Sequence, residues 1–446
     1  MARSKPFTYC EGAPSWNPSA YAADAPLHSR VEGLLASDDL QAAVTASFSL
    51  PPARRDPYVY HAIVSVTLPE VQHAVSLGRR NGLHSWYRGP VPADASKPAA
   101  PSPVALPPPP RPDIEAYLSV FDPSTSTPAA LKTFLSNAKK GSLRAEIAAY
   151  LNAKRYLHPA LAAQLTVPKR AKNKNAANST NNPNAVPPNP YLSFLYWSAR
   201  ALEWAGPCES SFRAGLMAHH VLPVLMHHFG CACPTHEALS ILQTLAAGRG
   251  IVDMGSGGGY FAFMLRAYGV KCTAVDSAQS AWRVNWVSDT TIADGAAWLR
   301  KRRKVRAAIS TTGDENGVDP DEAVLLMVYP IVGGEIAGGA EGGFTRSMMD
   351  AYGGDTLAVV GTQNHNGYTG FRGMSMDEYV EREQKDWVKV VQVALPSFPG
   401  KDEALYVFQR GSRAPARDGS STATAGEVSG TSGGNSSSNN QEGTRA

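Results

Sequence analysis

The chain has 446 residues, 43% of them hydrophobic, which suffices for two or three domains and at least one large core. Its 34 prolines and 39 glycines, with only 18% charged residues, are not the composition of one compact body. We therefore expect much of the length to be linker or tail. The net charge of +4 is small for this size and does not mark the whole molecule as a nucleic-acid binder.

Cysteine content and hydropathy predict the compartment. The five cysteines form an odd, scattered set: Cys10, Cys208, Cys231, Cys233 and Cys272. Their spacing does not suggest a disulfide framework, which predicts a reducing, cytoplasmic location. Residues 1–6 are not followed by an apolar run of signal-peptide length. No stretch approaches about 18 uninterrupted apolar residues, so we expect no membrane partner.

The N-terminal part of the chain alternates ordered segments with a spacer. Residues 1–90 form a partly ordered region, with a helix expected over Ser29–Ala46 and a strand or short buried segment over Tyr58–Leu68. The Pro/Ala-rich tract 91–112 predicts a semi-rigid polyproline spacer, with a ligand for a proline-reading domain as the alternative. A helical segment follows over 113–166, where apolar residues recur every three or four positions.

The rest of the chain divides into four parts. Residues 167–190 are a basic, Asn- and Pro-rich linker. Residues 191–247 predict two or three aromatic-rich helices, which either pack on a catalytic domain and shape its substrate entrance or are plain core. Residues 248–411 are expected to form the domain that carries the functional site. The polar tail 412–446 has almost no apolar residues to bury, so we expect it to be disordered.

The most informative segment, Gly250–Leu265, is an apolar strand that runs into a glycine turn and then into an apolar-periodic helix. Glycines permit positive φ and close approach of a ligand, and the first helical turn offers unpaired N–H groups. A dinucleotide site needs G-x-G-x-x-G, and its third glycine position is here Tyr260, which is too bulky. The spacing is instead Asp253-x-Gly255-x-Gly257-x-Gly259. It resembles the first motif of class I S-adenosylmethionine (SAM)-dependent methyltransferases.

The order of the downstream elements is also similar to that family. Val270–Asp276 is a second strand that ends in a carboxylate, and Ala323–Pro330 and Thr356–Gly361 are apolar strands of the kind buried in parallel sheets. Trp387–Leu395 and Ala404–Gln409 have no helix between them, so they must pair antiparallel. The predicted fold class is α/β: a Rossmann-like, doubly wound, mostly parallel sheet with an antiparallel C-terminal hairpin, preceded by a mainly helical region and long linkers.

The resemblance implies SAM as the cofactor and a set of residues that bind it. The glycine turn would admit the methionine portion, and Asp253 would hold its ammonium group directly or through water. Asp276 would accept protons from both ribose hydroxyls, and Asp294 would take the adenine amino group. The expected cofactor-binding residues are Asp253, Gly255, Ser256, Gly257, Gly259, Asp276, Asp294 and Tyr329.

Polar residues after the fourth and fifth strands are candidates for the acceptor side. His365, in the segment Thr362–Tyr368, is the expected base, because an acceptor oxygen or charged amine must lose its proton. Ordinary turn chemistry explains the same Asn-rich segment equally well. Tyr329 and Glu335 are expected to line the pocket without taking part in the chemistry.

The fourth strand departs from one branch of the family. Methyltransferases acting on exocyclic amino groups end this strand in Asn/Asp-Pro-Pro-aromatic, whereas here Val328–Glu335 matches only the central proline. This argues against a base- or glutamine-amide-directed reaction. The sequence assigns the chain to no characterised branch.

Histidines and cysteines are dense over residues 219–236, which raises the question of a metal. Zinc sites commonly use C-x₂₋₄-C spacing, and Cys231-x-Cys233 is tighter than that. Adjacent histidines on a helix also point in different directions. We therefore expect no metal site and a helix with a histidine-rich face.

Two basic runs allow more than one interpretation. Lys169–Lys172 matches a short nuclear-import pattern, although basic runs in loops are usually only solvated. Arg300–Lys304 is a denser patch that offers phosphate contacts to RNA or a surface for an acidic protein. Cations near a helix C-terminus also simply satisfy the helix dipole, which is the favoured explanation.

The function that this pattern favours is SAM-dependent methyl transfer to an acceptor of unknown class. The alternative is a non-catalytic SAM-binding or regulatory protein that keeps the fold. A nucleotide-dependent oxidoreductase is disfavoured by Tyr260 and by the terminal hairpin. The sequence identifies neither the methylated atom nor the oligomeric state.

Overall fold

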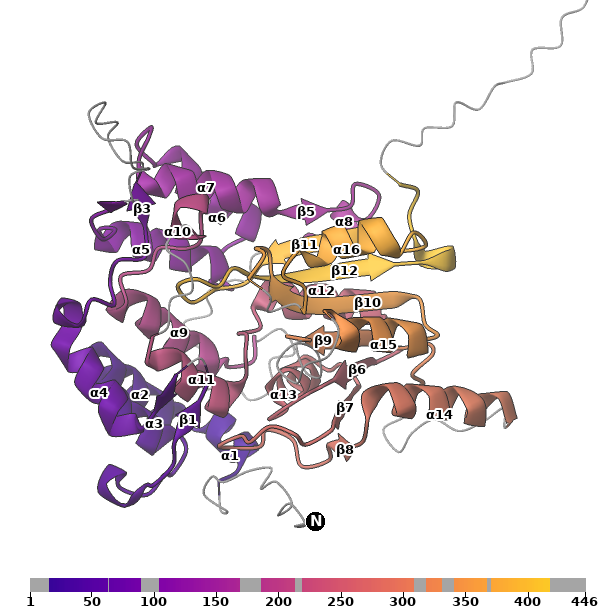
Figure 1. Cartoon of the computed structure of the whole chain (residues 1–446), viewed down its shortest axis with the longest axis horizontal. Coiled ribbons are helices and arrows are strands. Elements are labelled where there is room, and N and C mark those ends of the chain that lie inside the picture. The colour runs from indigo at the N-terminus through magenta and orange to yellow at the C-terminus, as the bar shows by residue number, and fades with distance from the viewer. Residues whose placement is uncertain are drawn as a thin grey trace, which may run out of the picture. The chain divides into compact units, whose positions relative to one another are not determined.

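The computed structural model describes residues 16–62, 64–89, 104–168, 186–212, 219–308, 318–330, 341–366 and 370–417 (Figure 1). Contacts group the residues up to Pro415 into one compact unit and the remainder into a second. Within the described residues, no helix has both the length and the apolar character that crossing a membrane requires.

An eight-stranded sheet organises the first unit. In spatial order its strands are β5 (Tyr156–Leu157), β11 (Val388–Ala394), β12 (Glu403–Gln409), β10 (Thr356–Thr362), β9 (Val324–Val328), β6 (Ile251–Met254), β7 (Cys272–Asp276) and β8 (Thr291–Ile292). The pairs from β8 to β10 are all parallel, whereas β12 is antiparallel to both β10 and β11. The predicted α/β fold with a mostly parallel sheet and an antiparallel C-terminal hairpin is therefore confirmed.

The sheet is covered on both faces, which explains why its strands read as continuous apolar runs. Alternate strand residues face opposite sides, so Val252 and Met254 join one core while Ile251 joins the other. The first face packs against α14 (Gly295–Ala308), α15 (Gly343–Ala351) and α16 (Met376–Glu383). The second packs against α13 (Tyr260–Ala267) and the helices that precede the sheet in the chain.

The described residues between 190 and 246, which leave out 213–218, contain four helices, where the sequence predicted two or three. They are α9 (Pro190–Ala201), the single turn α10 (Glu209–Phe212), α11 (Val221–Phe229) and α12 (His236–Ala246). Buried aromatic residues of this layer, among them Tyr191 and Phe229, pack on Tyr260 of α13. The layer therefore shares its core with the second face of the sheet.

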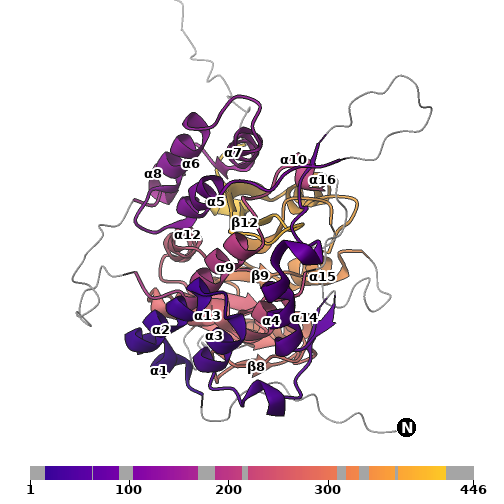
Figure 2. The same ribbon diagram turned by 90° about the vertical axis from the view of Figure 1, so that its left-hand side faces the viewer.

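The remaining N-terminal elements form two groups (Figure 2). The first, which packs on α9 and α11, contains α1 (Pro18–Ala23), α2 (Ala25–Ala36), α3 (Leu40–Ser47), β1 (Tyr60–His61), β2 (Ser65–Val66) and α4 (Leu68–Leu77). The second has its own core and contains β3 (Arg88–Gly89), β4 (Val104–Ala105), α5 (Arg111–Leu118), α6 (Thr127–Ser136) and α7 (Leu143–Lys154). The short helix α8 (Ala162–Leu165) buries Leu165 in the core of the first group. Short 3₁₀ turns cover Ala53–Arg55, Gly78–Asn81, Ser119–Phe121 and Gly411–Arg413.

The structure differs from two local predictions. The single helix expected over Ser29–Ala46 is broken into α2 and α3, because Asp38 has a φ of 59° and the side chain of Asp39 caps α3 by accepting from Ala42 N. For Tyr58–Leu68, where a strand or a short buried segment was expected, the structure has a hairpin of two short strands, and Thr67 with Glu70 then forms a capping box that begins α4.

The predicted linkers are described only in part. The tract 91–112 contains β4 and the first residues of α5. Residues 90–103, 169–185 and 418–446 lie outside the described residues, so the nuclear-import run and most of the expected tail stay predictions.

Candidate functional site

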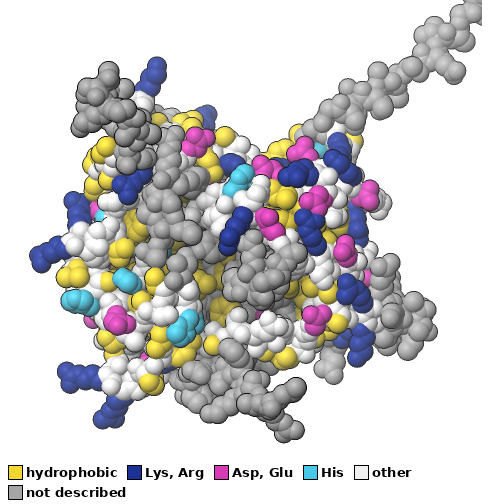
Figure 3. All heavy atoms as spheres, in the orientation of Figure 1, with side chains coloured by type: hydrophobic (Ala, Val, Ile, Leu, Met, Phe, Trp, Pro, Cys, Tyr) yellow, Lys and Arg dark blue, Asp and Glu magenta, His cyan; other side chains and the backbone are white. Residues whose placement is uncertain are grey.

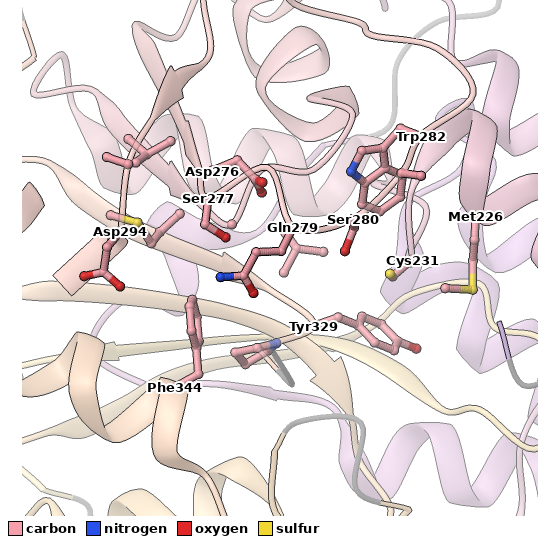
Figure 4. Close-up of a pocket in the computed structure, with 18 of the residues that line it drawn as sticks. Met226, Cys231, Asp276, Ser277, Gln279, Ser280, Trp282, Asp294, Tyr329 and Phe344 are labelled. Carbon is pink, nitrogen blue, oxygen red and sulfur yellow. The ribbon is translucent and has the colours of Figure 1, made fainter. Parts of the chain in front are cut away.

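A cavity of about 480 Å³ lies at the carboxyl ends of β6, β7 and β9. The chain proceeds from β6 to β7 on one side and returns to β9 on the other, so the cavity lies at the point where the strand order reverses. Open α/β sheets bind ligands in this position. Figure 4 shows Asp294 and Phe344 at one end, Met226, Cys231 and Tyr329 at the other, and Asp276, Ser277 and Gln279 between them.

The glycine turn closes the cavity beside β6. Gly255, Gly257 and Gly259 all have positive φ, at 75°, 55° and 80°, which glycine tolerates best. Gly255 borders the cavity. A Cβ at Gly257 would lie 2.5 Å from Trp282, and one at Gly259 would lie 2.5 Å from Val287. The chain's own side chains therefore occupy the space beside these two glycines.

Asp276 lies on the wall of the cavity and is held by two backbone amides. Its Oδ2 accepts from Gly257 N at 2.9 Å, and its Oδ1 accepts from Ala278 N at 2.7 Å. The acid at the end of the second strand thus touches the glycine turn directly. These bonds orient the carboxylate, whose oxygens keep further lone pairs for a ligand.

Asp253 is 1% exposed and does not line the cavity. It pairs in register with Ala274 and Leu326, which belong to the face covered by α13. Neither carboxylate oxygen has a hydrogen-bond partner of ordinary geometry among the described residues, although Ala262 N is near enough to lower the pKa somewhat. Burial, and next the charge of Asp276, raise the pKa of Asp253 to about 7.

Asp294 and Tyr329 both line the cavity, at opposite ends. Asp294 Oδ1 accepts from Ala297 N at 2.8 Å in the first turn of α14. Tyr329 follows β9 with a φ of 52°, and its hydroxyl donates to Glu403 Oε1 at 2.6 Å. Of the expected residues, Gly255, Asp276, Asp294 and Tyr329 therefore come together at one cavity.

The structure does not bring His365 or Ser256 to this cavity. The His365 side chain is 53% exposed, and its Nε2 lies 2.9 Å from Glu378 Oε2. That carboxylate also caps α16 by accepting from Ser375 N. His365 thus belongs to a helix cap, which removes the geometric ground for its expected role as the base.

Several residues of the cavity were missed by the sequence analysis. They are His61, Met226, His227, Cys231, Ser277, Gln279, Ser280, Ala281, Trp282 and Phe344. The segment after Asp276 was predictable in kind, since loops at the carboxyl ends of parallel strands carry ligand contacts. The contributions from β1 and α11 carry no local sequence signal, because tertiary packing alone brings them to the sheet.

A buried ion pair connects the N-terminal hairpin to the loop that lines the cavity. Arg283 Nη2 lies 2.9 Å from both carboxylate oxygens of Asp56, and the two side chains are 4% and 7% exposed. The guanidinium also covers the Tyr58 ring at 4.2 Å, and Arg283 N donates to His227 O at 2.8 Å. This clasp (Asp56, Tyr58, His227 and Arg283) holds the loop that contains Trp282.

The histidines of α11 are bound to tyrosines of the hairpin. His227 Nδ1 lies 2.6 Å from Tyr58 Oη, and His228 Nε2 lies 3.1 Å from Tyr60 Oη. Burial lowers the pKa of both histidines, most strongly that of His228. Within the described part of the chain, no three His, Cys, Asp or Glu side chains are grouped so as to hold a metal.

A second polar cluster lies behind Tyr329, at the start of β12. Lys401, Asp402 and Glu403 are 4%, 0% and 1% exposed. Burial lowers the pKa of Lys401 to about 8 and raises that of Asp402 to about 6. Burial also raises the pKa of Glu403 to about 8, against the opposing charge of Lys401. The sequence analysis treated these residues only as part of the loop that joins the last two strands.

The basic patch expected on α14 is described only in its first part. Arg300 and Lys301 are exposed, while the Arg302 guanidinium lies 5.4 Å from the centre of the Trp298 ring. On the right-hand side of the face drawn in Figure 3, Lys and Arg side chains are interspersed with Asp and Glu. Ion pairs such as Arg346–Glu383 fit this mixed pattern. A contact to RNA or an acidic protein stays a prediction.

No protein-family model matches the sequence, and no curated protein matches it. Solved structures match at low identity. Magnesium protoporphyrin IX methyltransferase from Synechocystis PCC 6803, with bound SAM, matches at 9% identity and a TM-score of 0.24, over 39% of this chain and 79% of that one. A putative SAM-dependent methyltransferase from Streptococcus mutans matches at 10% identity and a TM-score of 0.25, over 38% of this chain and 46% of that one.

The mitomycin 7-O-methyltransferase matches at 13% identity and a TM-score of 0.24, over 88% of this chain and 95% of that one. The S. mutans match spans less than half of its counterpart. Values this low carry no argument about activity. The fold is supported by the strand order and the reversed strand β12 themselves.

Proposed function

We propose that this protein binds SAM in the cavity at β6, β7 and β9 and transfers its methyl group to an acceptor. The observation that carries the proposal is the meeting of Gly255, Asp276, Asp294 and Tyr329 around one cavity at the reversal of strand order. Four residues chosen from a sequence pattern, over a span of 75 positions, line a single site. A chance resemblance of the glycine turn alone does not account for that agreement.

The residues around the cavity fit a nucleoside cofactor. A volume of about 480 Å³ lies within the range of about 300–1,000 Å³ that small-molecule sites occupy. Apolar walls from Met254, Val275 and Phe344 suit a purine. Carboxylates are the acceptors that hydroxyl and amino groups need, and Asp276 and Asp294 supply them.

In this proposal each residue has a simple task. Asp276, already oriented by two amides, accepts hydrogen bonds from the ribose, and Asp294 accepts from the adenine amino group. Gly255 leaves room for the rest of the cofactor. When bound, SAM supplies a methyl group on a positively charged sulfur, a good leaving group. The protein then has to align the acceptor and exclude water.

Calorimetry tests the binding part of the proposal. The wild-type protein is expected to bind SAM and S-adenosylhomocysteine and to show no heat with NAD(H). Asp276→Ala removes a charged acceptor and is expected to weaken S-adenosylhomocysteine binding about 100-fold. Asp289→Ala is a matched control, because this nearby acid is 42% exposed and pairs with Arg266. Tight binding of NAD(H) alone would contradict the proposal.

Binding without transfer is the second candidate, and one observation favours it. The expected base, His365, lies outside the cavity and pairs with Glu378 at a helix cap, so the base predicted from the sequence is not at the site. Incubation with tritiated SAM and fractionated cell extract separates the candidates. Label that appears in an acceptor supports an enzyme, whereas binding with no labelled fraction supports a SAM sensor.

A further inference from the structure

Three consecutive charged residues are buried at the edge of the sheet that carries the cavity. Strand β12 runs against its neighbours, so Lys401, Asp402 and Glu403 at its beginning lie beside the carboxyl ends of the parallel strands. A buried charge is costly unless it is paired. The partners of each residue therefore show which of them the fold itself needs.

Asp402 is fully engaged in holding the fold together. Its Oδ2 accepts from Tyr150 Oη at 2.6 Å, and its Oδ1 accepts from Gln363 Nε2 at 2.9 Å. These bonds tie α7 and β10 to the start of β12. The pairing explains why a carboxylate with no exposed surface is tolerated here.

Glu403 is only half satisfied. Its Oε1 accepts from Tyr329, while its Oε2 is buried and has no hydrogen-bond partner among the described residues. Lys401 Nζ lies 5.4 Å from the centre of the Tyr329 ring, so a buried cation accompanies the carboxylate. Packing alone does not require a carboxylate in this position.

Tyr329 connects this carboxylate to the cavity. Its backbone is in the left-handed region, with a φ of 52°, which a bulky residue rarely adopts. The N–H of Tyr329 donates to Val360 O at 2.8 Å and holds the residue against β10. The strained residue thus has its ring on the cavity wall and its hydroxyl on Glu403.

We propose that Tyr329 and Glu403 form the proton relay for the methyl acceptor, and that the accepting group is a hydroxyl. This inference rests on the proposed methyl transfer. The acceptor oxygen forms a bond to the methyl carbon as the carbon–sulfur bond breaks, and the electron pair of that bond stays on sulfur. The acceptor proton passes to Tyr329 Oη, and the phenolic proton passes to Glu403 Oε1. The positive charge of the sulfonium and the negative charge of the Glu403 carboxylate cancel, because the sulfur becomes a neutral thioether and Glu403 a neutral acid.

A base in this position favours a hydroxyl over acceptor groups that are already ionised. A carboxylate needs no base, whereas a hydroxyl must lose its proton during the transfer. A thiol, with an ordinary pKa of about 8.5, ionises more readily than a hydroxyl. The cavity wall at this end is mostly apolar, with Met226, Val328 and Pro330, and burial raises the pKa of Cys231 to about 11, which keeps its thiol neutral. We therefore expect a hydroxyl carried on an apolar body.

The test combines product chemistry with three variants of the full chain, using tritiated SAM and fractionated extract of the source cells. Label is expected in material from which hydriodic acid, but not alkali, releases it, as in an O-methyl ether. Tyr329→Phe removes the relay hydroxyl and is expected to slow transfer about 100-fold or more. Tyr406→Phe is the matched control, since its buried hydroxyl has no partner among the described residues and should be dispensable.

Glu403 acts through Tyr329, so its variant needs a readout beyond the rate. The wild-type rate is expected to rise with pH, reach half of its maximum near pH 8, the pKa of Glu403, and level off above it. In Glu403→Gln that rise should be lost, with kcat reduced and KM little changed. Lys401 is present in both proteins and also has a pKa of about 8, which the charge of Glu403 helps to hold up. In Glu403→Gln a rise caused by Lys401 would therefore persist at lower pH instead of being lost, which distinguishes the two groups. Burial makes the pKa of His219, about 3, too low to titrate in this range.

Each outcome separates the relay from the underlying function. If the wild-type protein fails to bind S-adenosylhomocysteine or labels nothing, the proposed methyl transfer fails and the relay fails with it. If the wild type transfers label but Tyr329→Phe keeps more than half of the rate, only the relay is overturned. Label on nitrogen, sulfur or a carboxylate would overturn the hydroxyl assignment.

Discussion

Asp253 is a buried carboxylate at the centre of the sheet, and its position gives it a direct effect on stability. Burial raises its pKa to about 7, well above the ordinary range of an aspartate. The folded protein therefore holds a proton that the unfolded chain releases, and stability falls as pH rises through this interval. The full contribution is present below the unfolded pKa and is lost by about pH 7.

Asp253→Asn keeps the shape and removes the charge. We expect urea midpoints of the two proteins to be similar near pH 4, and the variant to be the more stable near pH 8. The wild type should lose stability relative to the variant at up to about 1.4 kcal/mol per pH unit between these limits. Parallel pH profiles for the two proteins would show that Asp253 does not titrate as inferred.

Two glycines of the same turn allow a matched comparison. Gly257→Ala places a Cβ 2.5 Å from the Trp282 ring, whereas the nearest heavy atom to a Cβ at Gly255 is Phe344 Cζ at 3.8 Å. Both changes cost about 1–2 kcal/mol for the left-handed backbone. We expect Gly257→Ala to cost more than this in urea unfolding and to change Trp282 fluorescence. Equal losses in both variants would mean that Trp282 moves freely.

At the level of single residues, the sequence predicted those site residues whose positions follow from their spacing along the chain. The glycine turn and the acid after the second strand could be predicted, because one strand–turn–helix unit positions them locally. Trp282 and Glu403 could not, because their roles depend on which strands become neighbours in the sheet. His365 shows the reverse case, in which a plausible residue at the correct strand end turns instead toward a helix cap.

Among the elements, the hairpin β1–β2 has contacts that the sequence did not predict. Only the apolar character of this segment was evident from the sequence. The clasp joins residues 227 positions apart, Asp56 and Arg283, and no local pattern predicts such a pair. Its consequence is that an N-terminal element controls the position of a loop beside the cofactor cavity. The helical layer around residue 227 thus shares in the site, as the expected substrate entrance would require.

Breaking the clasp should loosen that loop. Arg283→Met leaves Asp56 buried without its partner, which is expected to cost about 3–5 kcal/mol. Hydrogen exchange should accelerate in residues 277–284 before it does in β6, and S-adenosylhomocysteine binding should weaken. Adding Asp56→Asn to the same chain should restore part of the stability. If exchange rises uniformly over the whole unit, the clasp has no special relation to the loop.

For the whole molecule, the strand order could be predicted from the sequence because apolar runs and their connections constrain it strongly. The attachment of the N-terminal part could not. Strand β5, which precedes the glycine turn by about a hundred residues, pairs with β11, and a single core contains side chains from α2, α9, α13 and β12. The sequence analysis placed the chemistry in 248–411, and the packing surrounds this segment with earlier elements.

A fragment spanning 248–411 should therefore not fold as the full chain does. Its α13 face would expose Phe261 and Tyr260, which are 6% and 2% exposed in the full chain. We expect the fragment to bind a hydrophobic dye and to unfold without a cooperative transition. A sharp transition at the temperature of the full-length protein would establish the fragment as an independent domain.

The two outermost strands of the sheet, β5 and β8, have two residues each. A long free edge is a template on which another chain can add a strand, and natural proteins blunt such edges by keeping them short. With two-residue strands at both limits, this sheet offers little backbone for a second molecule to extend. Self-association of the protein would then have to proceed through side-chain surfaces on its helices rather than through continuation of the ladder.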